Sequence, residues 1–170
     1  MRAVQISFGL VITLIGLLLF LMTSGWMALT PLDTVGYALI LSGLCFWIPG
    51  IAWRRALPWL TALFIPGALA FAIGAGLMYT QRTEAGLSAW SYLWTTLLVA
   101  LGVAFLAMYS LGPRAGWLRF VGIIVGGVGI LLFAVLGMVF STEPTTRVVG
   151  SVLLIALGLV FTIGALLPRK

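Results

Sequence analysis

Long apolar runs, separated by a few charged residues, dominate the pattern of this chain. Six runs carry no charged residue, and each is long enough for an α-helix, which rises 1.5 Å per residue, to cross about 30 Å of hydrocarbon. The runs are Ala3–Leu32, Thr34–Trp53, Ala56–Gln81, Ala85–Pro113, Phe120–Thr142 and Val148–Pro168. They predict six membrane-spanning helices near residues 5–24, 34–53, 58–80, 89–111, 117–141 and 147–167.

The amino-acid composition also indicates a membrane protein. Of its 170 residues, 63% are hydrophobic and 7% are charged, whereas roughly a quarter of the residues in soluble domains are charged. The first apolar run follows Arg2, and a basic residue before an apolar run is also the pattern of a cleaved signal peptide. However, no Ala-x-Ala-like cleavage site follows Met22. We therefore expect a retained first helix in a single transmembrane domain that spans residues 1–170.

Repeated signatures indicate how this all-α polytopic bundle is organised. The segment "GLVITLIGLLLF" at residues 9–20 resembles "GIIVGGVGILLF" at residues 122–133. The even-numbered helices share Gly43-Leu-Cys-Phe46, Gly102-Val-Ala-Phe105 and Gly158-Leu-Val-Phe161. These matches predict three tandem two-helix repeats, about 1–57, 58–114 and 115–170, with pseudo-three-fold parallel symmetry about an axis along the membrane normal. Chance agreement in a glycine-rich sequence is the alternative.

Small residues mark the faces where helices are expected to meet. Lipid provides no hydrophobic drive between helices, so small side chains let two backbones approach and gain dispersion contacts. Ala68, Ala72 and Gly76 recur every four residues, and Gly122 and Gly126 form a GxxxG pattern. Together with the signature glycines Gly43, Gly102 and Gly158, they are the predicted helix-packing residues. The pattern fits packing within the chain or self-association.

Basic residues predict the orientation, because cytoplasmic loops carry an excess of Lys and Arg. A cytoplasmic N-terminus places seven of the nine basic residues inside; only Arg82 and Arg147 lie outside, with the acids Asp33, Glu84 and Glu143. We expect both termini inside, in a bacterial cytoplasmic (inner) membrane. Six of the seven form a predicted basic rim: Arg54, Arg55, Arg114, Arg119, Arg169 and Lys170. We expect this rim either to bind lipid headgroups or acidic partner segments, or only to fix the topology.

Residues that usually perform chemistry are scarce. The chain has no histidine and one cysteine, Cys45, which falls inside a predicted span. No ionisable residue falls in the middle of a span, where ion-coupled transporters usually carry one. We therefore expect no catalytic, metal-binding or cofactor-binding residues, no enzyme activity and no ion-coupled pump. The net charge of +6 is accounted for by anionic lipid headgroups, so we expect membrane lipids, and no nucleic acid, as partners.

Two segments stand out within the three Gly- and Leu-rich two-helix units: "VGYALILSGLCFWIPG" at Val35–Gly50 and "VGSVLLIALGLVFTIG" at Val149–Gly164. With these segments the chain resembles the HdeD-like acid-resistance membrane proteins. The resemblance implies a six-helix inner-membrane fold without a defined catalytic site.

Three functions stay open at this stage. The first is a non-catalytic structural or accessory subunit that packs with other integral membrane subunits. The second is a stand-alone stress protein of the HdeD-like kind. The third is a carrier, channel or lipid-handling protein for a neutral or apolar substrate.

Overall fold

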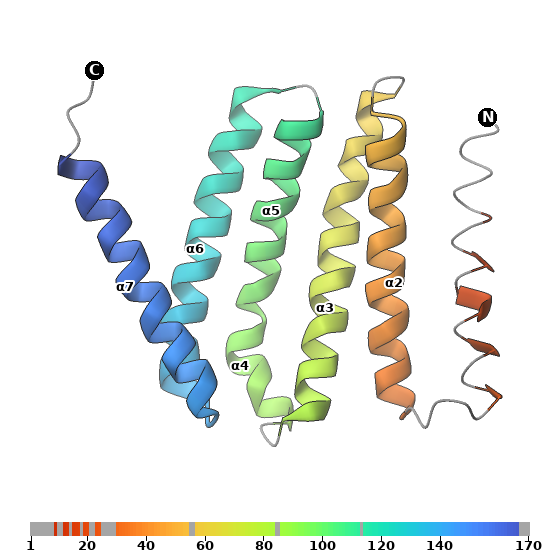
Figure 1. The fold of residues 1–170 in the computed structure, drawn as a ribbon, viewed down its shortest axis with the longest axis horizontal. Coiled ribbons are helices and arrows are strands. Elements are labelled where there is room, and N and C mark those ends of the chain that lie inside the picture. Colours follow the sequence, from red (N-terminus) through yellow and green to blue (C-terminus); the bar gives the residue numbers. More distant parts are fainter. Residues whose placement is uncertain are drawn as a thin grey trace.

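The computed structural model describes residues 30–54, 57–83, 86–112 and 114–166, together with isolated positions between 9 and 24; beyond residue 159 it describes the backbone only. Every regular element in this part of the chain is helical. With the labels of Figure 1, the elements are α2 (Pro31–Ala52), the 3₁₀ helix η1 (Pro58–Leu63), α3 (Phe64–Arg82), the 3₁₀ helix η2 (Gly86–Ala89), α4 (Trp90–Leu93), α5 (Thr95–Leu111), α6 (Gly116–Phe140) and α7 (Pro144–Leu166).

Several of these helices have the length and composition of membrane spans. Pro31–Ala52, Pro58–Arg82 and Gly116–Phe140 each suffice to cross a membrane. A fourth span results if Gly86–Leu93 and Thr95–Leu111, which are bent by 46° relative to each other, are counted together. Pro144–Leu159 is a shorter apolar helix. The described part of the chain thus has three or four candidate spans, as expected of a membrane protein, and half of the residues of the predicted first span lie outside the described residues.

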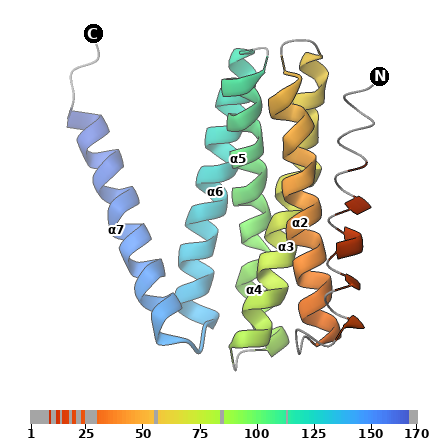
Figure 2. The same ribbon diagram turned by 45° about the vertical axis from the view of Figure 1, so that its right-hand side comes forward.

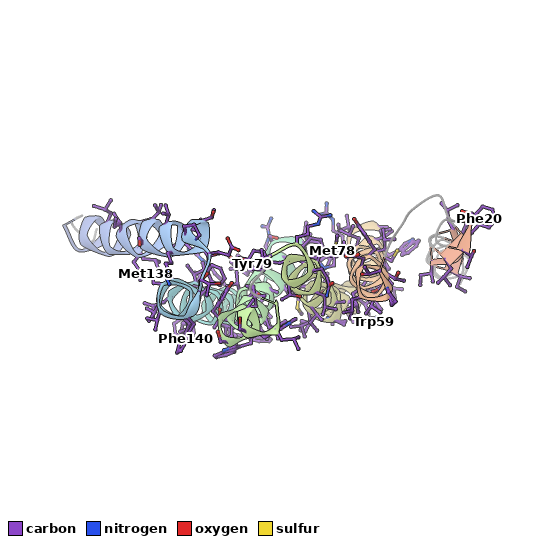
Figure 3. The ribbon with its side chains drawn as sticks, turned by 90° about the horizontal axis from the view of Figure 1, so that it is seen from below. Phe20, Trp59, Met78, Tyr79, Met138 and Phe140 are labelled. Atoms are coloured by element: carbon purple, nitrogen blue, oxygen red, sulfur yellow. The ribbon has the colours of Figure 1, made fainter. Side chains whose placement is uncertain are left out.

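The long helices stand side by side in chain order. Neighbours in the sequence run in opposite directions and pack against each other, from α2 to α3, α5, α6 and α7. Seen from below, they form a shallow layer (Figure 3), so the described helices lie in a row rather than around a central axis. Figure 2 shows that α7 meets α6 near the turn that joins them and leans away from it toward the C-terminus.

Two pairs of helices within this row are held by glycines. A Cβ atom on Gly43 of α2 would lie 2.6 Å from the carbonyl oxygen of Gly67 in α3. A Cβ on Gly102 of α5 would lie 2.5 Å from the amide nitrogen of Gly126 in α6. Because these backbones approach where no side chain intervenes, the α2–α3 and α5–α6 pairs are the close-packed units of the fold. Each pair joins helices that the sequence assigned to successive repeats.

The fourth predicted span is broken, whereas the sequence predicted one helix over residues 89–111. The break lies at Trp94, between α4 and α5. The hydroxyl groups of Thr95 and Thr96 donate to the carbonyl oxygens of Tyr92 and Leu93, each at 2.6 Å. Side-chain bonds of this kind compete with the regular helical hydrogen bonds and bend helices. Both bonds lie at the bend.

Charged residues gather at the two ends of the layer. Arg54 follows α2, Arg114 precedes α6 and Arg119 lies in its first turns, so all three are at one end, here called the Arg114 end. The opposite end, here called the Arg147 end, carries four charged residues in the described part: Asp33, Arg82, Glu143 and Arg147. At this end α2 begins with a capping box between Thr30 and Asp33.

Candidate functional site

A partly open groove of about 740 Å³ lies between the two close-packed helix pairs. Its walls come from α2, α3, α4, α5, α6 and α7, and they are almost wholly apolar. Prominent wall residues are Trp47, Phe71, Ala75, Val99 and Val103. No charged residue lines the groove in the described part of the chain. Ligand pockets of about 300–1,000 Å³ with mostly apolar walls are typical of small-molecule sites.

The small residues of α3 explain why space remains there. Ala68 is buried in a core cluster with Phe64 and Ala104. Toward the Arg147 end, a Cβ on Gly76 would lie 3.2 Å from the ring of Trp90. Between these two contacts, Ala72 faces the groove and fills little of it. The predicted small-residue face therefore packs near its ends and leaves a hollow at its middle.

Hydroxyl groups gather where the groove meets the Arg147 end. The hydroxyl oxygens of Tyr79 and Thr146 are 2.9 Å apart, and Tyr92 donates to the Tyr79 oxygen at 3.4 Å. Tyr92 is 1% exposed and Thr146 is 9% exposed. Figure 3 shows Tyr79 on the side of α3 toward α6 and α7, whereas its neighbour Met78 lies toward α2. We call Tyr79, Tyr92 and Thr146 the hydroxyl cluster.

The hydroxyl cluster ties distant parts of the chain together. Tyr79 comes from α3, Tyr92 from α4 and Thr146 from the first turn of α7. Next to Thr146, the Arg147 Nε donates to the carbonyl oxygen of Ser141 at 2.7 Å. This bond braces the α6–α7 turn and leaves an exposed cation beside the end of the groove. The site thus combines an apolar trough, neutral hydrogen-bonding groups and one nearby positive charge.

The predicted basic rim lies at the other end of the layer. Arg114 and Arg119 are exposed and Arg54 is half-buried. Arg114 has a φ of 48°, in the left-handed region, and Arg119 borders a smaller cavity that also involves Trp47. The structure thus brings three rim residues to one end. The other three predicted rim residues lie outside the described residues: Arg55, Arg169 and Lys170.

The predicted packing glycines divide into two groups. Gly43, Gly102, Gly122 and Gly126 lie in the α2–α3 and α5–α6 contacts. Gly158 does not join them: it is exposed, and a Cβ there would meet no described atom within 4 Å. The reason is that α7 leans away from α6 over this part of its length.

The hydroxyl cluster was missed by sequence reasoning. Tyr79 and Tyr92 fall at the ends of predicted spans, where a tyrosine is usually an aromatic anchor at the membrane surface, so their positions alone do not indicate a shared site. One signal was present: Trp47 is the one tryptophan that lies clearly inside a predicted span rather than near its end, and it lines the groove. Cys45, the single cysteine, is buried in α2 and does not border the groove.

Comparison of the chain with protein-family models, with curated proteins and with solved structures finds no match.

Proposed function

We propose that this protein is a non-catalytic integral membrane protein that holds a neutral or apolar molecule in the groove. Of the three functions left open by the sequence, this one draws the most support from the geometry. The observation that carries it is the groove itself, with about 740 Å³ bounded by apolar side chains from both helix pairs. Apolar walls that face one another across such a space gain dispersion contacts only when another molecule fills it.

The proposal includes a membrane topology. Six spans, the first over residues 5–24, would place both termini on the cytoplasmic side of a bacterial inner membrane. The clustering of Arg54, Arg114 and Arg119 at one end supports this topology. The hydroxyl cluster and the end of the groove would then face the outer leaflet.

The proposal also keeps an origin by tandem duplication. The contacts Gly43–Gly67 and Gly102–Gly122 support it, because a Cβ on the first glycine of each pair would meet the carbonyl oxygen of the second glycine and the amide nitrogen four residues further on, at Phe71 and Gly126. Equivalent positions therefore form equivalent close contacts in the α2–α3 and α5–α6 pairs. In this proposal the repeats give a row with a groove between two pairs.

A filled groove provides the test. Ala72→Phe and Ala75→Phe each place a ring in the groove, whereas Ala156→Phe adds the same ring to the exposed part of α7. Native mass spectrometry of the parent, purified in mild detergent, should show a bound apolar molecule. The two groove variants should lose it and the Ala156→Phe control should retain it. Equal retention in all three variants would refute the proposal.

A second candidate function is an accessory subunit of a larger membrane assembly. The observation that favours it is an apolar stripe along α7, where Val148, Val152, Ile155 and Leu159 are each more than half exposed. Their spacing places them on one face of the helix, which a helix of another subunit could cover. Stoichiometric subunits that co-purify in mild detergent, and are lost in Val152→Lys and Ile155→Lys, would support this function; a lone monodisperse species would oppose it. A stand-alone HdeD-like stress function stays a prediction of the resemblance alone.

A further inference from the structure

We infer that the occupant of the groove is a glycerophospholipid of the leaflet at the Arg147 end, with one acyl chain in the groove, an ester carbonyl at the hydroxyl cluster and the phosphate beside Arg147. This inference rests on the proposed function and goes further by assigning the chemical class of the ligand and its direction. Three features of the site support it: the length of the groove, its unused proton donor and its flanking charge.

The length of the groove matches one leaflet. On α3 the wall runs from Ala68 to Tyr79, and on α4 and α5 it runs from Tyr92 to Val103. Each stretch covers a helix length of about 16 Å at 1.5 Å per residue. The hydrocarbon core of a bilayer is about 30 Å thick. The groove therefore starts at one end of the layer and stops near its middle, as the chain of a lipid in one leaflet does.

The hydroxyl cluster has a proton to donate. Each of the three hydroxyl groups has one O–H donor and can accept as well, and two hydrogen bonds connect them, Tyr92 to Tyr79 and Tyr79 with Thr146. If Tyr79 donates to Thr146, the Thr146 proton can be accepted by Tyr92, which also lies within hydrogen-bond reach of it. If Thr146 donates to Tyr79, the Tyr79 proton is left over, and in this arrangement the cluster offers one donor to a ligand. An ester carbonyl, which only accepts, is a suitable partner.

The charge beside the cluster selects the headgroup. Arg147 follows Thr146 directly and is exposed, with its Nε held by the Ser141 carbonyl. Guanidinium groups form strong, charge-assisted hydrogen bonds with phosphate oxygens. In a phospholipid the phosphate is separated from the acyl esters by the glycerol carbons alone. A chain in the groove and an ester at the cluster therefore bring the phosphate to Arg147.

Photolabelling with lipids of known geometry tests this direction. The full chain, purified in mild detergent micelles, is mixed with a trace of diazirine phospholipid. The diazirine lies either next to the ester or at the end of the chain. We expect the first probe to label peptides that contain Tyr79 or Thr146, and the second to label those that contain Ala68 or Val103. Excess unlabelled phospholipid should compete with both. A reversed order, or labelling that does not saturate, would overturn the inference.

Two matched variants test the headgroup. Arg147→Gln should weaken saturable labelling about tenfold, whereas Arg82→Gln should leave it unchanged. Arg82 carries the same charge at the same end, but its side chain bonds Tyr37, which does not line the groove. If diacylglycerol, which lacks the phosphate, competes as well as phospholipid does, the inference fails and the proposed function stands. If neither probe labels the groove peptides and the parent carries no other apolar molecule, the inference and the proposed function both fail.

Discussion

Alanine at Gly102 should disrupt the α5–α6 pair, whereas alanine at Gly126 should not. A Cβ at position 102 would lie 2.5 Å from the Gly126 nitrogen and 2.9 Å from the Gly122 carbonyl oxygen. Non-bonded heavy atoms prefer separations of about 3.5–4.0 Å, so the two backbones must part by about 1 Å. In the reverse case, a Cβ at position 126 would lie 3.4 Å from the nearest atom, the Gly102 Cα, which is an ordinary contact.

The expected loss for Gly102→Ala follows from this displacement. A gap of about 0.5–1 Å forfeits a quarter to a half of the dispersion attraction between the atoms it separates, and helices in lipid have no hydrophobic drive to restore the contact. Overpacked sites typically lose about 1–3 kcal/mol. We expect the upper part of that range, about 2–3 kcal/mol, because the atoms in conflict belong to backbone that cannot repack.

Unfolding by SDS titration from mild detergent micelles, followed by tryptophan fluorescence, measures the free energies of unfolding. The control is Gly127→Ala, next to Gly126 on α6, where a Cβ meets no described atom within 4 Å. It should equal or exceed the parent in stability, because alanine favours helix over glycine. If Gly102→Ala unfolds at the same SDS fraction as Gly126→Ala and Gly127→Ala, the α5–α6 contact is not the one described above.

Three further predictions concern the ends of the layer. Thr30→Ala removes the bond that the Thr30 hydroxyl oxygen accepts from the Asp33 amide in the capping box that begins α2, and leaves the bond from the backbone N–H of residue 30 to the Asp33 carboxylate; it should lower the free energy of unfolding by about 1 kcal/mol, measured by the same titration. Tyr79→Phe removes the bond to Thr146 and should lower the free energy of unfolding by about 1 kcal/mol. Tyr37→Phe removes an exposed 3.4 Å bond from Arg82 and should lower the free energy of unfolding less. A reporter that is active only in the periplasm should be inactive when fused after Lys170; activity there would reverse the proposed topology.

Much of the fold is determined locally, and the sequence reveals that part. Helix is the form in which an isolated segment satisfies its own backbone hydrogen bonds in lipid, and the bilayer sets the length required. The described helices accordingly begin and end within a few residues of the uncharged runs. The break at Trp94 is the exception, because Thr95 and Thr96 could equally have bonded the backbone of an unbroken helix.

Which faces meet is decided by the tertiary structure. These helices are apolar on every side, so the sequence pattern contains no amphipathic direction that would indicate an inner face. Gly102 and Gly158 stand in the same signature, yet one lies against Gly126 and the other is exposed. Tyr79 and Thr146 are separated by 67 residues, and nothing local to either indicates the other. The groove and its hydroxyl cluster exist because the α2–α3 and α5–α6 pairs and the lean of α7 bring such residues together, which is a property of packing that no single helix contains.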